Sequence, residues 1–111
     1  MTLRFLTLPV STNALYAHTG RRRFMTDRGA RNKQAIGWEA RSQYRAKPLE
    51  GPLKVQIALY WPDKRKHDID NIKVLLDALT GIVWEDDSQI VDLHLTKSID
   101  TKQPRVEMTL N

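Results

Sequence analysis

LKVQIALYW, residues 53–61, is the clearest strand pattern in the chain, and the other elements can be assigned around it. Its large apolar residues alternate with smaller or more polar ones. The apolar positions are Leu53, Val55, Ile57, Leu59 and Trp61. Because successive side chains of a strand point to opposite faces, this alternation predicts a strand with one face against a hydrophobic core. Pro62 follows and ends the strand, since it has no N–H to donate.

Five further elements are expected on either side of this strand. They are strands over residues 2–8, 89–97 and 105–110 and helices over residues 27–46 and 69–80, with a loop over residues 9–24. Thr26 is placed to cap the first helix, and Gly81 is placed to end the second. SIDTKQP, residues 98–104, is typical of a turn, so we expect the last two strands to form a hairpin. The order β-α-β-α-β-β predicts an α/β (α+β) fold with a four-stranded mixed sheet and two helices.

Length and composition are those of one ordinary globular domain. The chain has 111 residues, of which 41% are hydrophobic and 28% charged, so a single domain over residues 1–111 is expected. No apolar run is long enough to cross a bilayer, and MTLRFLTLPVST is too short and too strand-like for a signal peptide. The absence of cysteine excludes disulfides and zinc-thiolate sites, which fits an intracellular protein.

Charge is distributed unevenly along the chain. The net charge is +5, yet residues 1–50 carry ten Lys and Arg against three acids, whereas residues 51–111 carry eight against ten. A basic surface for a phosphate backbone beside a small acidic site is the arrangement of a metal-dependent nuclease. Chance segregation of charge on a solvated surface gives the same distribution.

The acidic half contains two aspartates one residue apart, Asp68 and Asp70. In an extended stretch both carboxylates point the same way, and Mg²⁺ prefers such oxygen ligands. On a helix covering residues 69–80, Asp70, Lys73 and Asp77 would share one face, because they are three and seven positions apart. Ile72, Leu76 and Leu79 would line the core face. This spacing favours a helix that separates chemistry from packing.

A second acidic pair, Asp86 and Asp87, follows the Gly81 break. A chain that turned back there could bring one of these carboxylates beside Asp68 and Asp70, and three carboxylates in one pocket would repel strongly without a cation. The alternative is a structural role, because Asp-x-Asp commonly caps helices and Asp-Asp pairs commonly occupy solvated turns.

Basic residues are candidates for DNA phosphate contacts. They comprise Arg21, Arg22 and Arg23 with further cations over residues 28–47, and Lys64, Arg65 and Lys66 beside the acidic site. The alternative is a solvated helix face. We expect Trp38, Trp61 and Trp84 in the core or an interface rather than as base-stacking platforms.

DIDNIKVLLDALTGIVWEDDSQIVD, residues 68–92, resembles the signature of the RusA family of Holliday-junction endodeoxyribonucleases, which phages and prophages often carry. LPVSTNALYAHTGRRRF, residues 8–24, is similar to the opening loop of that family, and Lys97 and the closing hairpin also match. The resemblance covers nearly the whole chain, and the Asp-x-Asp-Asn, Asp-Ala-Leu and Asp-Asp-x-Gln motifs carry it.

The resemblance implies a Mg²⁺-dependent homodimer, with Mn²⁺ as an alternative metal, that binds four-way junctions and cuts two strands symmetrically. It also implies action in the bacterial cytosol or nucleoid. The catalytic and metal-binding aspartates of the family fall on Asp68, Asp70 and Asp87, and its catalytic lysine falls on Lys73. Asp86 matches a companion metal ligand, and Asn13 and Tyr16 match the DNA-contacting loop.

The spacing departs from the family pattern at one place. Asn71 and Asp77 are six steps apart, whereas family sequences usually have seven. On a continuous helix this change moves Lys73 from one side of Asp70 to the other, at 100° per residue. Lys73 still lies on the same broad face of the helix, so the assignment is kept, and a later start of the helix would also absorb the missing residue.

Two other functions fit the same residues. A basic module that binds branched DNA without cutting it would have this charge pattern but no need for converging carboxylates. A nuclease that prefers flaps or replication forks would have both. Junction cleavage by wild type and Asp70→Asn distinguishes the first, and a panel of branched substrates distinguishes the second.

Overall fold

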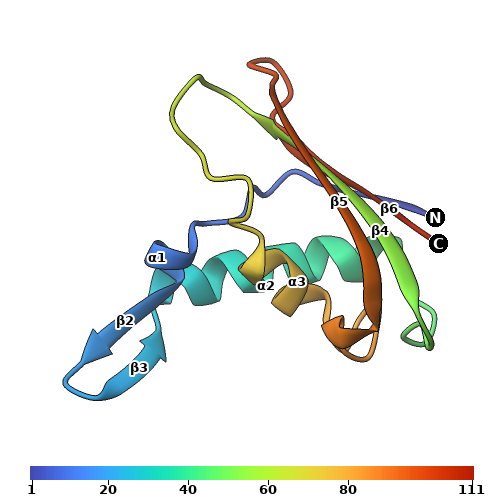
Figure 1. Cartoon of the computed structure of the whole chain (residues 1–111), viewed down its shortest axis with the longest axis horizontal. Coiled ribbons are helices and arrows are strands. Elements are labelled where there is room, and N and C mark those ends of the chain that lie inside the picture. The colour runs from blue at the N-terminus through green and yellow to red at the C-terminus, as the bar shows by residue number, and fades with distance from the viewer.

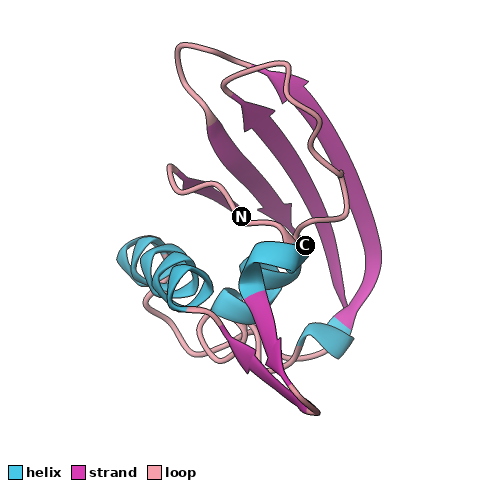
Figure 2. Cartoon of the chain, turned by 90° about the vertical axis from the view of Figure 1, so that its left-hand side faces the viewer, coloured by secondary structure: helices cyan, strands magenta, loops and turns pink.

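The computed structural model describes all residues 1–111 and contains a four-stranded mixed sheet (Figures 1 and 2). Its strands are β1 (Thr2–Phe5), β6 (Arg105–Leu110), β4 (Leu53–Trp61) and β5 (Ile90–Ile99), in that spatial order. β4 pairs in parallel with β5 and antiparallel with β6, which pairs antiparallel with β1. The expected fold class is confirmed, but the expected hairpin of β5 and β6 is wrong, because β4 lies between these strands.

The core lies on one face of this sheet. The alternate residues of β4 from Leu53 to Trp61 are buried, as the sequence pattern predicts, whereas Lys54 and Gln56 on the other face are exposed. Helices pack on the buried face only, so the molecule has one helical layer and one open sheet face (Figure 2). None of the helices has the length and apolar character that crossing a membrane requires.

The two expected helices are present with shifted ends. In α2 (Asp27–Gln43) the Thr26 side chain accepts a hydrogen bond from the N–H of Gly29 at 3.0 Å, so the predicted cap is confirmed. α3 (Lys73–Leu79) is shorter than expected at its start, because residues 68–72 form a turn instead of a first helical turn. Its apolar side, which includes Leu75 and Leu79, is buried.

Residues 9–24 are not a loop throughout, contrary to expectation. They contain the one-turn helix α1 (Thr12–Leu15) and strand β2 (Tyr16–Thr19), and β3 (Arg22–Met25) follows to complete a hairpin. Gly20 turns the chain with φ of 61°, a conformation that favours glycine. The hairpin projects from the N-terminal end of α2 (Figure 1). Its strands are short and carry no extended apolar pattern, so the sequence alone does not reveal them.

The three tryptophans differ in burial. Trp84 is fully buried and Trp61 is 9% exposed, in agreement with the expectation of core positions. Trp38 is 65% exposed on α2, so it is not a core residue.

Candidate active site and nucleic-acid interface

Asp68 and Asp70 lie on the loop that joins β4 to α3, and both are exposed. A compact turn shapes this segment: the N–H of Asn71 donates to the carbonyl of Asp68 at 3.2 Å, and that of Ile72 donates to the carbonyl of Asp70 at 2.8 Å. The Asn71 side chain accepts from the N–H of Thr12 at 3.3 Å, which ties the turn to α1. The backbone of the two aspartates is therefore bonded while their carboxylates remain accessible.

His67 anchors the same loop to the sheet. Its ring stacks on the indole of Trp61 with centroids 3.8 Å apart and an interplanar angle of 3°. Its Nε2 lies 3.1 Å from Oδ1 of Asp63, and Lys97 on β5 donates from Nζ to the carbonyl oxygen of His67 at 2.6 Å. The hydrogen bond from the His67 ring, with that from the Arg65 N–H, lowers the pKa of Asp63 below its ordinary value. We call His67, Trp61, Asp63 and Lys97 the loop anchor.

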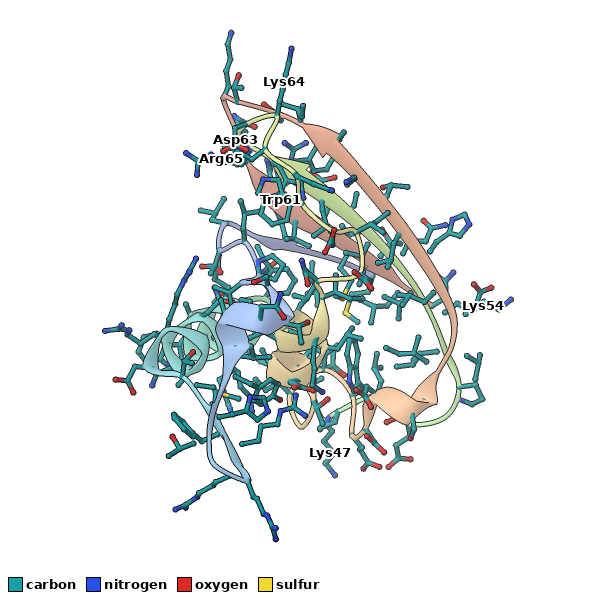
Figure 3. The ribbon with its side chains drawn as sticks, turned by 60° about the vertical axis from the view of Figure 1, so that its left-hand side comes forward. Lys47, Lys54, Trp61, Asp63, Lys64 and Arg65 are labelled. Carbon is teal, nitrogen blue, oxygen red and sulfur yellow. The ribbon has the colours of Figure 1, made fainter.

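Sequence reasoning missed the loop anchor. No spacing in the sequence pairs His67 with Trp61 or Asp63, and Lys97 was matched only through the family resemblance. The only signal was indirect. Trp61 is the last residue of an apolar strand face (Figure 3), so a residue of the loop that follows is needed to cover its indole ring. Which residue returns depends on the path of the loop, which local patterns do not encode.

Lys73 is the first residue of α3, and its Nζ lies 3.6 Å from Oδ2 of Asp77. This pair agrees with the expected shared face. Because the helix begins at Lys73, Asp70 lies outside it, and the helical angle between Asp70 and Lys73 does not describe their relation.

Asp86 and Asp87 lie beyond the other end of α3, where the 3-10 turn η1 (Asp87–Gln89) leads into β5. The Ser88 hydroxyl donates to Oδ2 of Asp86 at 2.8 Å, and this hydrogen bond is the main cause of the lowered pKa of Asp86. The Gln89 side chain accepts from the N–H groups of Glu85 and Asp86. Asp87 is exposed.

The two acidic segments are held apart by α3. Its seven residues span about 10 Å at 1.5 Å per residue, and Figure 1 shows the loop of Asp68 and Asp70 at one end and η1 at the other. No group of three or more His, Cys, Asp or Glu residues in the chain is placed to hold one metal ion. The assignment of Asp87 and Asp86 as ligands alongside Asp68 and Asp70 therefore stays a prediction.

The donor set of the loop suits Mg²⁺ in its usual mode. This ion is commonly bound by one or two carboxylates, with waters and substrate phosphate oxygens completing its shell. Asp68 and Asp70 are exposed, close in sequence and free of any hydrogen bond or ion pair to their carboxylates. Two such carboxylates fit that mode without a third protein ligand.

The predicted DNA-binding residues fall into two groups. Arg21, Arg22 and Arg23 are exposed on the β2–β3 hairpin, where the Arg23 guanidinium lies 3.7 Å from the centroid of the Tyr16 ring. Asn13 is exposed on the adjacent α1. The other group comprises the exposed Lys64, Arg65 and Lys66 near the loop anchor; Figure 3 shows Lys64 extending into solvent beside Trp61 and Asp63. Asp68 and Asp70 directly follow the second group along the chain.

Comparison with known proteins assigns the chain to one family. The family model described as Endodeoxyribonuclease RusA matches residues 7–111. The crossover junction endodeoxyribonuclease RusA of Escherichia coli K12 is 33% identical over 104 residues, which cover 92% of this chain and 87% of that protein. The protein of the same name from Enterobacteria phage 82 has the same identity and coverage, and that of Escherichia coli O139:H28 is 30% identical. The chain belongs to the RusA family of endodeoxyribonucleases.

Proposed function

We propose that this protein is a structure-selective endodeoxyribonuclease that resolves four-way DNA junctions by paired symmetric nicks. Its relatives are named crossover junction endodeoxyribonucleases. The observation that carries the proposal is the pair of accessible carboxylates, Asp68 and Asp70, on a loop fixed by the loop anchor and by Asn71. A structural capping role would leave these side chains hydrogen-bonded, and they are not.

In the proposed reaction, water attacks a phosphodiester phosphorus and the bond to the leaving oxygen breaks. Asp68 and Asp70 would hold Mg²⁺, which when bound supplies an acidified water and charge stabilisation at the scissile phosphate. Lys73 can exchange its partner Asp77 for a phosphate oxygen and so offset developing negative charge. Asp87 and Asp86 are proposed as further ligands.

The proposed active form is a twofold homodimer in the bacterial cytosol. A four-way junction presents paired strands, so a twofold dimer sets one site against each of two opposed strands. The exposed cations of the hairpin and of residues 64–66 would bind the arms through phosphates, without reading the base sequence.

Junction cleavage tests the proposal. Wild type should nick two opposed strands of a synthetic four-way junction when Mg²⁺ is present, and Mn²⁺ should replace it. Asp70→Asn should bind the junction as wild type does but fail to cut it. Asp92→Asn, which removes an exposed carboxylate from β5, is the matched control and should cut normally.

Two results would reject the nuclease assignment: cleavage by Asp70→Asn at the wild-type rate, or binding by wild type without metal-dependent nicking. The second result would favour a non-catalytic junction-binding protein. Faster cutting of flaps or forks than of four-way junctions would replace the substrate class. Asp87→Asn tests the third carboxylate separately, because a carboxylate that takes no part leaves cleavage unchanged.

A further inference from the structure

An open groove lies between α2 and α3, away from the loop anchor. It has a volume of about 660 Å³ and is bordered by α2, by α3 and by the turn that follows α3. Figure 1 shows α3 lying against α2 along this line. Gly37 lies at the bottom of the groove and adds no side chain to it. A Cβ added at Gly37 would lie 3.6 Å from Cδ1 of Ile82.

One side of the groove is a stripe of long side chains on α2. Arg31, Gln34, Trp38 and Arg41 are three, four and three positions apart, so they follow one face of the helix. Trp38 is 65% exposed in the middle of this stripe. A lone exposed apolar residue is ordinary, but an indole in a groove between two guanidinium groups has the composition of a nucleic-acid stacking site.

Charge in the groove selects the class of ligand. Three cations line it, Arg31, Lys33 and Arg41, against a single acid, Asp77. The acid in the middle of α2, Glu39, points to the opposite side, where its carboxylate accepts from the N–H groups of Leu6 and Thr7. A phosphate chain is therefore favoured over a cationic or purely apolar ligand.

We propose that this groove binds an unpaired stretch of a DNA strand, with a base stacked on Trp38 and its flanking phosphates near Arg31 and Arg41. The proposal deepens the proposed function and rests on it, because a junction that opens at its branch point supplies unpaired bases. The indole face is accessible to a splayed base and not to a base stacked within a duplex. Trp38 would thus favour branched or single-stranded DNA over intact duplex.

Fluorescence and binding measurements on the full-length protein test the proposal. Trp84 and Trp61 are buried, so Trp38 should dominate any change on ligand binding. Oligothymidine should quench wild-type emission, and Trp38→Phe should lose most of that response. Trp38→Ala should weaken oligothymidine binding by about tenfold, the loss of one stacked base, and duplex binding by much less. Trp38→Phe, which keeps a ring, should recover most of the affinity.

Leu6→Ala is the control, since Leu6 is another strongly exposed apolar residue outside the groove. It should leave both affinities unchanged, and thermal denaturation should show that all variants are folded. Equal losses of oligothymidine and duplex affinity in Trp38→Ala, or no loss, would overturn the proposal. A different oligomeric state of Trp38→Ala from that of wild type in sedimentation would also overturn it, because this face would then be a contact between copies of the chain. Normal junction cleavage alongside any of these results would leave the nuclease assignment standing.

Discussion

Replacing His67 by alanine should loosen the loop that carries Asp68 and Asp70 while leaving the core intact. The substitution removes the stack on Trp61 and the contact with Asp63, but not the carbonyl oxygen that Lys97 binds. The Asp63 side chain is 42% exposed, so solvent screens its contact with the His67 ring and the stack sets the magnitude. An aromatic pair contributes about 0.5–1.5 kcal/mol beyond area burial, so we expect a loss of about 1.5 kcal/mol with the ring area included.

This free energy should appear as local opening of the loop. Since about 1.4 kcal/mol corresponds to a factor of ten, the open population should rise roughly tenfold. If Asp68 and Asp70 act only in the anchored geometry, kcat/KM for junction cleavage scales with the anchored fraction of the protein. It should fall by up to about tenfold in His67→Ala, and the full factor is reached when most of the wild-type loop is already open. The unfolding midpoint should change little, because the loop contributes few side chains to the core.

Limited trypsin digestion measures the opening independently of activity, because Lys64, Arg65 and Lys66 lie in the same loop. His67→Ala should be cut there about ten times faster than wild type, in line with the free energy above. His67→Phe keeps the stack and loses only the polar contact, so its rate should stay closer to that of wild type. His94→Ala removes an exposed histidine of β5 and should behave as wild type in both assays. Equal digestion rates for His67→Ala and His94→Ala would refute the anchoring role.

Three further predictions concern the rest of the fold and the basic surface. Gly29→Ala should destabilise the fold by about 1–3 kcal/mol, because its Cβ would lie 2.8 Å from the carbonyl oxygen of Leu15. Gly37→Ala makes only ordinary contacts and should be neutral or stabilising. Urea denaturation measures both. Asp100→Asn should lower the free energy of unfolding at neutral pH. Hydrogen bonds, first that from the Gln103 N–H, lower the pKa of Asp100 below its ordinary value of 3.8. The contribution of the Asp100 carboxylate to stability is therefore present above that pH and is lost as pH falls through the lower folded pKa. The deficit of the variant should therefore shrink in strongly acidic urea titrations. Two arginines over residues 21–23 can be replaced by glutamine and DNA binding measured as a function of salt. The slope of log binding constant against log salt should become shallower by about 0.9 for each DNA phosphate that the variant no longer neutralises. The control Lys102→Gln should leave the slope unchanged.

Local patterns predicted those elements whose stability depends on near neighbours in sequence. The β4 strand was predicted with both of its ends, because its side chains alternate between a core and an open face. The start of α2 was predicted because Thr26 caps the helix within three residues. By contrast, the β2–β3 hairpin depends on contacts that no local pattern reveals, such as the hydrogen bond from the Thr26 hydroxyl to the carbonyl of Ala14.

Strand order was the part of the fold that sequence patterns did not determine. β5 and β6 are joined by a short turn, and a short turn favours a hairpin. In the structure each strand instead pairs with β4, so the most apolar strand has a neighbour on each side and occupies the interior of the sheet. Burial of the β4 face against the helices outweighs the preference for adjacent pairing.

The candidate site divides in the same way. The one-residue spacing of Asp68 and Asp70 places them on one loop, and this follows from the sequence alone. Whether Asp87 joins them depends on the path through α3, which sets about 10 Å of helix between the two segments. The sequence therefore places two of the three carboxylates on one loop, and their convergence with the third stays a prediction.

Lys97 shows how the sheet and the site depend on one another. In the parallel pairing of β4 and β5, Lys97 is level with Leu59, so it follows Leu93 and Leu95 on the face that packs toward the helices. A lysine there interrupts an apolar series, and its hydrogen bond to the carbonyl of His67 accounts for the exception. A one-residue slip of β5 would turn Lys97 to the open face and remove this bond. The β4–β5 register thus fixes the position of the loop, and through it the position of Asp68 and Asp70.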